Sequence, residues 1–182
     1  MQLLKCKAIA VVLLLLICSC VDDRIAKKET SAETLFTLVS NDQTGIHFKN
    51  TVVETSAFNI LNYYDMYNGG GVALADFNND ELIDIYFTSN QESNKLYINK
   101  GDFQFEDVTD KAGVQDTEGW TTGVTAIDIN NDGWMDLYVC KSASIASDRL
   151  RTNKLFINQK DGTFKEEAQQ WGLADDGYSI QS

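Results

Sequence analysis

Proline is absent from this chain of 182 residues, and histidine occurs once, as His47. Without proline, the turns have to rest on Gly, Asn and Asp. The single histidine and the lack of a Ser-His-Asp arrangement leave little for nucleophilic catalysis. Basic side chains are also scarce, since 15 Lys and Arg stand against 27 Asp and Glu for a net charge of −12. This balance argues against a nucleic-acid partner, because phosphate binding needs clustered Lys and Arg.

A long hydrophobic run is also missing. The longest one, residues 8–17, has ten apolar residues, whereas a membrane-spanning helix needs about 20. Lys5 and Lys7 precede the run. A short basic segment followed by a short apolar run is typical of a secretory signal, so we predict a signal peptide at residues 1–19.

The cysteines refine this prediction. The leader ends in "ICSC" at 17–20, which resembles the lipobox of bacterial lipoproteins. We predict Cys20 as the lipidated residue and residues 20–34 as lipid attachment site and polar tether; a plain signal peptide is the alternative. The acidic residues after Cys20 resemble surface-export signals, which favours a surface-exposed outer-membrane lipoprotein of the cell envelope. Cys140 is then alone in the body, where we expect a small buried side chain and no disulfide.

The body of the chain is an internal repeat. Residues 71–90 align without gaps on residues 123–142, at an offset of 52 positions. Residues 94–114 align on residues 153–173 at an offset of 59, so the second unit carries seven extra residues. A repeat of this length matches a β-propeller blade of four short antiparallel strands. A β-sandwich of the same strands is the alternative, but it gives no reason for the repeat.

Each unit contains four stretches of strand character. We therefore expect an all-β fold over residues 35–182, with about two propeller blades starting near residues 71 and 123 and an incomplete ring. A propeller needs about four to eight blades, so we expect an N-terminal fragment of a longer chain; ring closure by several chains is the alternative. After Val72 and Leu74, the expected strands are 82–88, 95–99 and 103–109 in the first unit, and 134–140, 154–158 and 163–167 in the second.

Two nine-residue stretches carry the same acidic pattern, "DFNNDELID" at 76–84 and "DINNDGWMD" at 128–136. Each places oxygen-bearing side chains at positions 1, 3, 5 and 9 of a tight loop. Calcium prefers six to eight oxygens from carboxylates, amides and main-chain carbonyls. We therefore predict two Ca2+ sites, to which position 7 contributes its carbonyl. The predicted ligands are Asp76, Asn78, Asp80, Leu82 and Asp84 in loop one, and Asp128, Asn130, Asp132, Trp134 and Asp136 in loop two.

Neither an EF-hand nor a zinc site fits these two loops. An EF-hand needs Glu at position 12, where this chain has Phe87 and Val139. Zinc prefers His and Cys ligands, which are absent near the loops. Turns rich in Asp and Asn without any metal remain an alternative. At position 6 loop two has Gly133 and loop one has Glu81; loop one is the poorer predicted site, because a positive φ there strains a residue other than glycine.

The repeats resemble FG-GAP/VCBS repeats, the calcium-loop blades of integrin α-chain propellers. Residues 58–90, "FNILNYYDMYNGGGVALADFNNDELIDIYFTSN", also resemble the opening blade of a bacterial family related to cartilage acidic protein and associated with an ASPIC/UnbV-type domain. The resemblance covers roughly residues 35–182. It implies an extracellular propeller of seven or a similar number of blades, in which calcium holds the outer hairpins.

The expected function is that of a lipid-anchored, calcium-binding module for an extracellular protein or glycan. Trp120, Tyr63, Tyr64 and Tyr67 are candidates for an aromatic binding surface, although packing in the core explains them equally well. An enzyme acting on polysaccharides is the rival interpretation, and it would need a carboxylate pair not already assigned to calcium. A purely structural role in an envelope assembly is the third. No catalytic residue is predicted.

Overall fold

A computed structural model describes residues 35–142 and 148–181. The predicted signal peptide at 1–19, the lipidated Cys20 and the tether at 20–34 lie outside the described residues. Residues 35–38 belong to a separate unit, Met1–Leu38, and all that follows concerns the compact unit Val39–Ser182. In the described part of the chain, no helix is long and apolar enough to cross a membrane.

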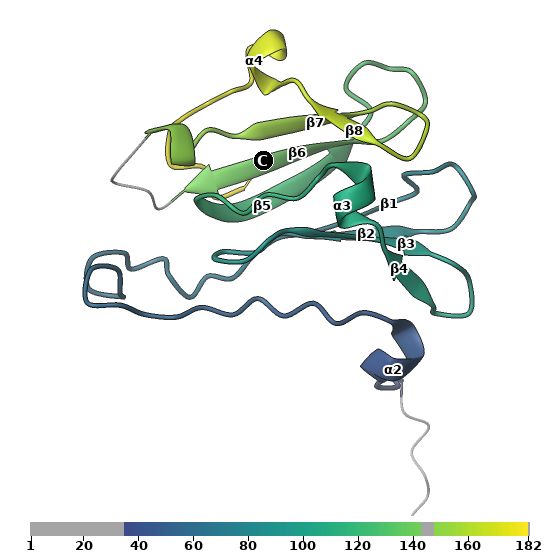
Figure 1. Cartoon of the computed structure of the whole chain (residues 1–182), viewed down its shortest axis with the longest axis horizontal. Helices are drawn as coiled ribbons and strands as arrows, with labels where there is room; N and C mark the ends of the chain where they lie inside the picture. The colour runs from purple at the N-terminus through teal and green to yellow at the C-terminus, as the bar shows by residue number, and fades with distance from the viewer. Residues whose placement is uncertain (1–34, 143–147, 182) are drawn as a thin grey trace, which may run out of the picture. The chain divides into compact units, whose positions relative to one another are not determined.

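Eight strands form two antiparallel sheets, each in simple sequence order (Figure 1). No described strand crosses from one sheet to the other, as a Greek-key sandwich would require. The prediction of an all-β fold with two four-stranded units in an incomplete, propeller-like arrangement is therefore confirmed. The first sheet consists of β1 (Val72–Ala75), β2 (Asp84–Phe87), β3 (Lys95–Asn99) and β4 (Phe105–Asp107), and the second of β5 (Trp120–Ile127), β6 (Asp136–Ser142), β7 (Lys154–Asn158) and β8 (Phe164–Glu166).

The two sheets repeat one another in register. Ala75 pairs with Asp84 where β1 meets β2, and Ile127 pairs with Asp136 at the equivalent place in the second sheet. The first two strands of the second sheet are longer than those of the first. β5 begins at Trp120 rather than near residue 123, and its register shifts between Thr121 and Val124. A bulge of this kind bends a strand and increases its twist.

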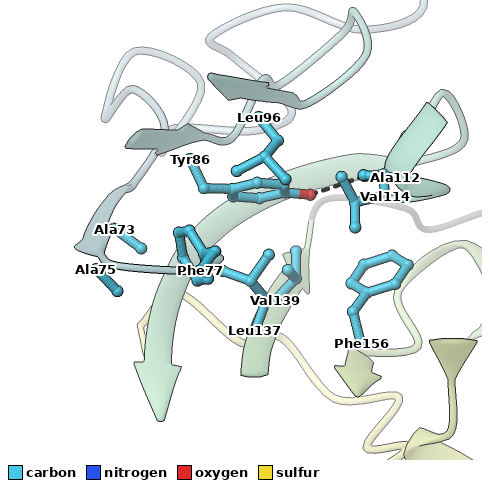
Figure 2. Close-up of a cluster of buried hydrophobic side chains, with 10 residues drawn as sticks. All are labelled: Ala73, Ala75, Phe77, Tyr86, Leu96, Ala112, Val114, Leu137, Val139 and Phe156. Carbon is cyan, nitrogen blue, oxygen red and sulfur yellow. Dashed lines mark hydrogen bonds between the residues drawn. The ribbon is translucent and has the colours of Figure 1, made fainter. Parts of the chain in front are cut away.

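The main core lies between the two sheets (Figure 2). Tyr86 of β2 is fully buried there, and its hydroxyl donates a hydrogen bond of 2.9 Å to the carbonyl of Val114. Tyr138 of β6 makes the same bond, 3.1 Å long, to the carbonyl of Leu173. The repeat therefore extends from the sequence to individual hydrogen bonds. The ten buried residues of the cluster are Ala73, Ala75, Phe77, Tyr86, Leu96, Ala112, Val114, Leu137, Val139 and Phe156.

Short helical turns complete the units. α3 (Thr109–Ala112) follows β4, and α4 (Ala168–Trp171) follows β8 at the equivalent place. Each ends at a glycine in the left-handed region, Gly113 and Gly172, where glycine carries no Cβ penalty. The sequence did not predict these turns, because four residues are too few to show a helical period. The remaining short elements are α2 (Asn41–Thr44) and η2 (Asp148–Leu150).

Candidate functional site

The two acidic stretches form equivalent connections in the two sheets (Figure 1). Loop one, residues 76–84, joins β1 to β2, and loop two, residues 128–136, joins β5 to β6. In both loops the ninth residue, Asp84 or Asp136, is fully buried. The acidic residues at positions 1 and 5 are half-buried or exposed. Each loop therefore has one buried carboxylate below a more open acidic turn.

Loop one is closed by its own side chains. The carboxylate of Asp76 accepts hydrogen bonds from the backbone amides of Asp80, at 3.1 Å, and Glu81, at 2.8 Å. Asn78 Oδ1 also accepts from the Asp80 amide, and Asp80 Oδ1 accepts from the amide of Leu82 at 2.9 Å. Side chains at positions 1, 3 and 5 are thus turned toward the middle of the loop.

Loop two has the same network, residue for residue. Asp128 accepts from the amides of Asp132, at 2.9 Å, and Gly133, at 2.8 Å. Asn130 Oδ1 accepts from the Asp132 amide, and Asp132 Oδ1 accepts from the amide of Trp134 at 2.9 Å. In both loops the Asn side chain also donates to the second oxygen of the Asp at position 5, at 2.9 Å. One local geometry therefore serves both predicted sites.

The carboxylate at position 9 connects the loop to the sheet. Asp84 accepts one hydrogen bond of 2.8 Å from the amide of Phe77 and another of 2.8 Å from the amide of Asn99 in β3. Burial, together with the charges of Asp80 and Asp76, raises the pKa of Asp84 to about 6, although these two hydrogen bonds act in the opposite direction. A buried carboxylate near other carboxylates favours a partner that carries positive charge.

Asp136 repeats this arrangement with the amides of Ile129, at 3.2 Å, and Asn158 in β7, at 2.8 Å. Burial raises its pKa too, and Asp132 and Asp128 act in the same direction. The electrostatic setting of position 9 is therefore common to the two loops.

The backbone is in the left-handed region at positions 4 and 6 of both loops. Asn79 and Asn131 at position 4 have φ of 56° and 55°, and position 6 has φ of 69° at Glu81 and 83° at Gly133. Asn tolerates the left-handed region and Gly adopts it freely, whereas Glu is strained there. The expected strain at position 6 of loop one is therefore present.

Two further contacts involve these loops, one within the second unit and one between the two loops. Lys160 Nζ lies 3.2 Å from Asp132 Oδ2, so loop two has a cationic side chain beside its fifth residue. The side chain of Asn79 donates to the carbonyl of Gly133 at 3.2 Å. The two loops are thus hydrogen-bonded neighbours rather than independent turns.

The acidic side chains are not gathered around one point. Within residues 35–142 and 148–181, no three His, Cys, Asp or Glu side chains form a group that could hold a metal ion as they stand. Asp76 and Asp80, like Asp128 and Asp132, direct oxygens to amides of their own loop. The donor set itself is all oxygen, which suits a hard cation.

The aromatic residues and the cysteine singled out in the sequence differ in how deeply they are buried. Trp120 is 5% exposed and packs on Met66, so it is mainly a core residue. Tyr63 is half-buried against it, whereas Tyr64 and Tyr67 are exposed. Cys140 is buried, as expected.

Sequence reasoning missed the asparagines that brace the loops. Asn99 and Asn158 end β3 and β7, and their side chains donate to loop carbonyls in both sheets. The available signal was the dipeptide Ile-Asn, which closes the third strand of both units.

Comparison with known proteins agrees with this geometry. Residues 76–139, which run from loop one through loop two, match the FG-GAP-like repeat family. The chain is also similar to Cartilage acidic protein 1 of Xenopus tropicalis, with 30% identity over 101 residues. That match covers 55% of this chain but 16% of the relative's length. An FG-GAP-like repeat indicates a β-propeller-type binding module. Together with the two repeated sheets, these matches support an FG-GAP repeat protein of the cartilage-acidic-protein-like type.

Proposed function

We propose that the chain is a calcium-binding, extracellular β-propeller module, anchored to the outer membrane by lipid on Cys20, that binds a protein or a glycan. The observation that carries the calcium part is the shared loop network, in which three aspartates and one asparagine recur at positions 1, 3, 5 and 9. A single acidic turn is explained by turn chemistry alone. Two networks of the same hydrogen bonds at equivalent places favour a common ligand.

The residues fit calcium in chemistry. Asp76, Asn78, Asp80 and Asp84, with the carbonyl of Leu82, would hold the ion in loop one. Asp128, Asn130, Asp132, Asp136 and the carbonyl of Trp134 would do so in loop two. Bound calcium supplies the positive charge that a buried carboxylate and its two acidic neighbours need. The loop amides that now satisfy Asp76 and Asp128 orient those carboxylates toward the interior of each turn.

Thermal unfolding of the full chain with calcium, magnesium or chelator tests the ion. A ligand at about 100 times its Kd stabilises a protein by about 2.7 kcal/mol. We expect calcium to raise the Tm of the unaltered chain more than magnesium does. The rise with calcium should be smaller in Asp132→Ala. Asp110→Ala is the matched control, because Asp110 is exposed and lies outside both loops. A Tm that ignores calcium and chelator would refute the calcium sites.

The anchor needs its own test. We expect the chain, produced in a Gram-negative host, to incorporate labelled palmitate and to fractionate with the outer membrane. Cys20→Ser should lose both properties, whereas Cys140→Ser should keep them. Labelling that survives in Cys20→Ser would refute the anchor but leave the calcium proposal intact.

A further inference from the structure

Two adjoining cavities lie where the first strands of the two sheets begin. One, of about 290 Å³, is lined by residues that include Val72 at the start of β1 and Trp120 at the start of β5. The other has a volume of about 340 Å³. Tyr63, Asp65 and Ile180 line both, so the two cavities adjoin and together make up one depression of the surface. Such concave sites with a few convergent polar groups are the usual places for ligands.

The wall of the second cavity is a fixed group of aromatic rings. Phe58 and Tyr63 are stacked, with centroids 5.5 Å apart and an interplanar angle of 19°. Both rings meet Trp120 edge-on, at 5.1 Å and 5.5 Å. Because Trp120 is buried, this wall is held in place without a ligand. A preorganised wall saves the entropy that ordering side chains would cost on binding.

Two exposed tyrosines complete the second cavity. Tyr64 is 82% exposed and Tyr178 is 58% exposed, and both line it. The guanidinium of Arg151 lies over the Tyr178 ring, 4.6 Å from its centroid, and its Nε donates to the carbonyl of Asp176 at 3.0 Å. Tyr178 thus already engages one cation through its ring.

One carboxylate gives the depression its charge. Among the described residues that line the two cavities, Asp65 is the single charged side chain. Its Oδ1 is fixed by a hydrogen bond of 2.8 Å from Asn68 Nδ2. The chain as a whole carries a net charge of −12. A positively charged ligand would meet the Asp65 carboxylate locally and a favourable field at long range, while Arg151 covers one face of Tyr178.

We infer that this depression binds an organic cation, an alkylammonium or guanidinium group, between the faces of Tyr63, Tyr64 and Tyr178 and beside Asp65. The inference names the ligand class of the binding module proposed above and rests on that proposal. Aromatic faces attract such cations through their quadrupole, most strongly where water is partly excluded. A free molecule and a Lys or Arg side chain of a protein share this chemistry, and the experiment below distinguishes them.

A neutral sugar fits the same residues less well. Sugar hydroxyls need open hydrogen-bonding groups, and both polar atoms of the Asn62 side chain, which lines the second cavity, already have a partner within the chain. Its Oδ1 accepts from the amide of Asn59 at 2.9 Å, and its Nδ2 donates to the carbonyl of Ala57 at 2.8 Å. Asn68 is likewise bonded to Asp65.

Calorimetric titration of the full chain, in buffer with calcium, tests the inference. The probes are choline and its neutral isostere 3,3-dimethyl-1-butanol, which have nearly the same shape. We expect choline to bind about tenfold more tightly than the isostere, because the cation–π and carboxylate contributions need the charge. N-acetyl-lysinamide and N-acetyl-argininamide form further arms. Binding of these amides points to a protein partner, and binding of choline alone points to a free cation.

Variants locate the site. Tyr64→Ala and Asp65→Asn should each weaken choline binding about fivefold. Tyr67→Ala is the matched control, because Tyr67 is 62% exposed and does not line either cavity. Near-ultraviolet circular dichroism checks that each variant keeps its fold.

Three results would overturn the inference: equal binding of choline and its isostere, no binding of any cation, or binding of glucose or galactose in place of the cations. The same preparations are melted with calcium and chelator. If the Tm of the chain rises with calcium but the chain binds no organic cation, this inference alone is refuted. A chain that binds choline but ignores calcium refutes the calcium sites alone.

Discussion

The side chain of Asn158, at the end of β7, donates a hydrogen bond of 2.8 Å to the carbonyl of Phe77 in loop one. It also donates to the carbonyl of Met135 in its own sheet, at 3.2 Å. Asn99 stands at the equivalent place in the first sheet and donates to the carbonyl of Ile83 at 2.9 Å. Asn158 therefore does what Asn99 does and, in addition, ties the second sheet to the first loop.

Replacing these asparagines should separate the two roles. Asn158→Ala leaves the buried Phe77 carbonyl without this donor, so we expect a loss of about 2 kcal/mol in the free energy of unfolding. Asn99→Ala removes the bond to the Ile83 carbonyl and the 2.9 Å bond that its Oδ1 accepts from the Gly101 amide. Both lie within one sheet at a half-buried site, and their loss should cost about 1 kcal/mol. Urea unfolding of both variants measures the difference. Equal losses would mean that the bond between the sheets adds no stability.

Loop one should gain stability from a glycine at position 6. Glu81 has φ of 69°, a conformation that Gly133 adopts in loop two. We expect Glu81→Gly to raise the free energy of unfolding by about 1 kcal/mol, because the strain of a left-handed residue is removed.

The reverse change provides the control. Gly133→Ala should lower the free energy of unfolding by a similar amount, since a Cβ at Gly133 meets nothing within 4 Å and only the backbone is strained. Thermal unfolding compares the two. A fall in Tm for Glu81→Gly would mean that the Glu81 side chain contributes more than its backbone costs.

Without calcium, the free energy of unfolding should fall as pH rises. A carboxylate whose pKa is lowered in the folded state has the opposite effect. Burial raises the pKa of Asp84 to about 6, above the value of about 3.9 for an unfolded Asp. Between about pH 4 and pH 6 the native state then binds more protons than the unfolded state. The free energy of unfolding should therefore fall as pH rises through this range, and Asp136 adds to the effect.

Urea unfolding in chelator at several pH values from about 4.5 to 7.5 measures this dependence. Asp107 behaves in the opposite way: burial alone would raise its pKa, but hydrogen bonds from Thr109 and Lys95 outweigh it and keep the pKa low. Its contribution is lost only below about pH 4, outside the range used. Stability that rises between about pH 4.5 and 6.5 in chelator would contradict the assignment to Asp84.

The local features could be predicted from the sequence because they depend on residues that are close together in the chain. The alternation around Val72 and Leu74 predicted β1, and the spacing of Asp76 and Asp84 predicted a tight loop that the structure places between β1 and β2. These signals arise within a few residues and occur twice. Repetition then identified the unit of the fold.

Features that depend on packing between distant segments could not be predicted in this way. Trp120 is a core residue because the segment carrying Phe58, Tyr63 and Met66 folds over it, and no local pattern announces that contact. The same holds for Asn158, whose partner Phe77 is 81 positions away. Asp65 likewise lines a cavity together with Val72 of β1 and Trp120 of β5, which are in different units of the repeat.

A buried ion pair between β6 and the segment before β5 offers a last test. Lys141 and Asp116 are both about 1–3% exposed, and Lys141 Nζ lies 2.6 Å from Asp116 Oδ2. Asp116 has a second partner, Lys154, at 3.0 Å. Lys141 also donates to the carbonyl of Glu118, and burial lowers its pKa against the attraction of Asp116. The equivalent of Lys141 in the first sheet is Ser89, so the fold of a unit does not require this pair.

The two partners should therefore respond unequally to truncation. Asp116→Ala leaves the Lys141 ammonium buried without a counter-charge, and should cost about 3–5 kcal/mol. Lys141→Met should cost less, because Asp116 keeps Lys154. The double variant should recover part of the loss of Asp116→Ala, since no buried ammonium remains. A double-mutant cycle from urea unfolding measures the coupling. Additive losses would mean that the two groups stabilise the sheet independently, and that Lys141 is buried for its alkyl chain rather than for its charge.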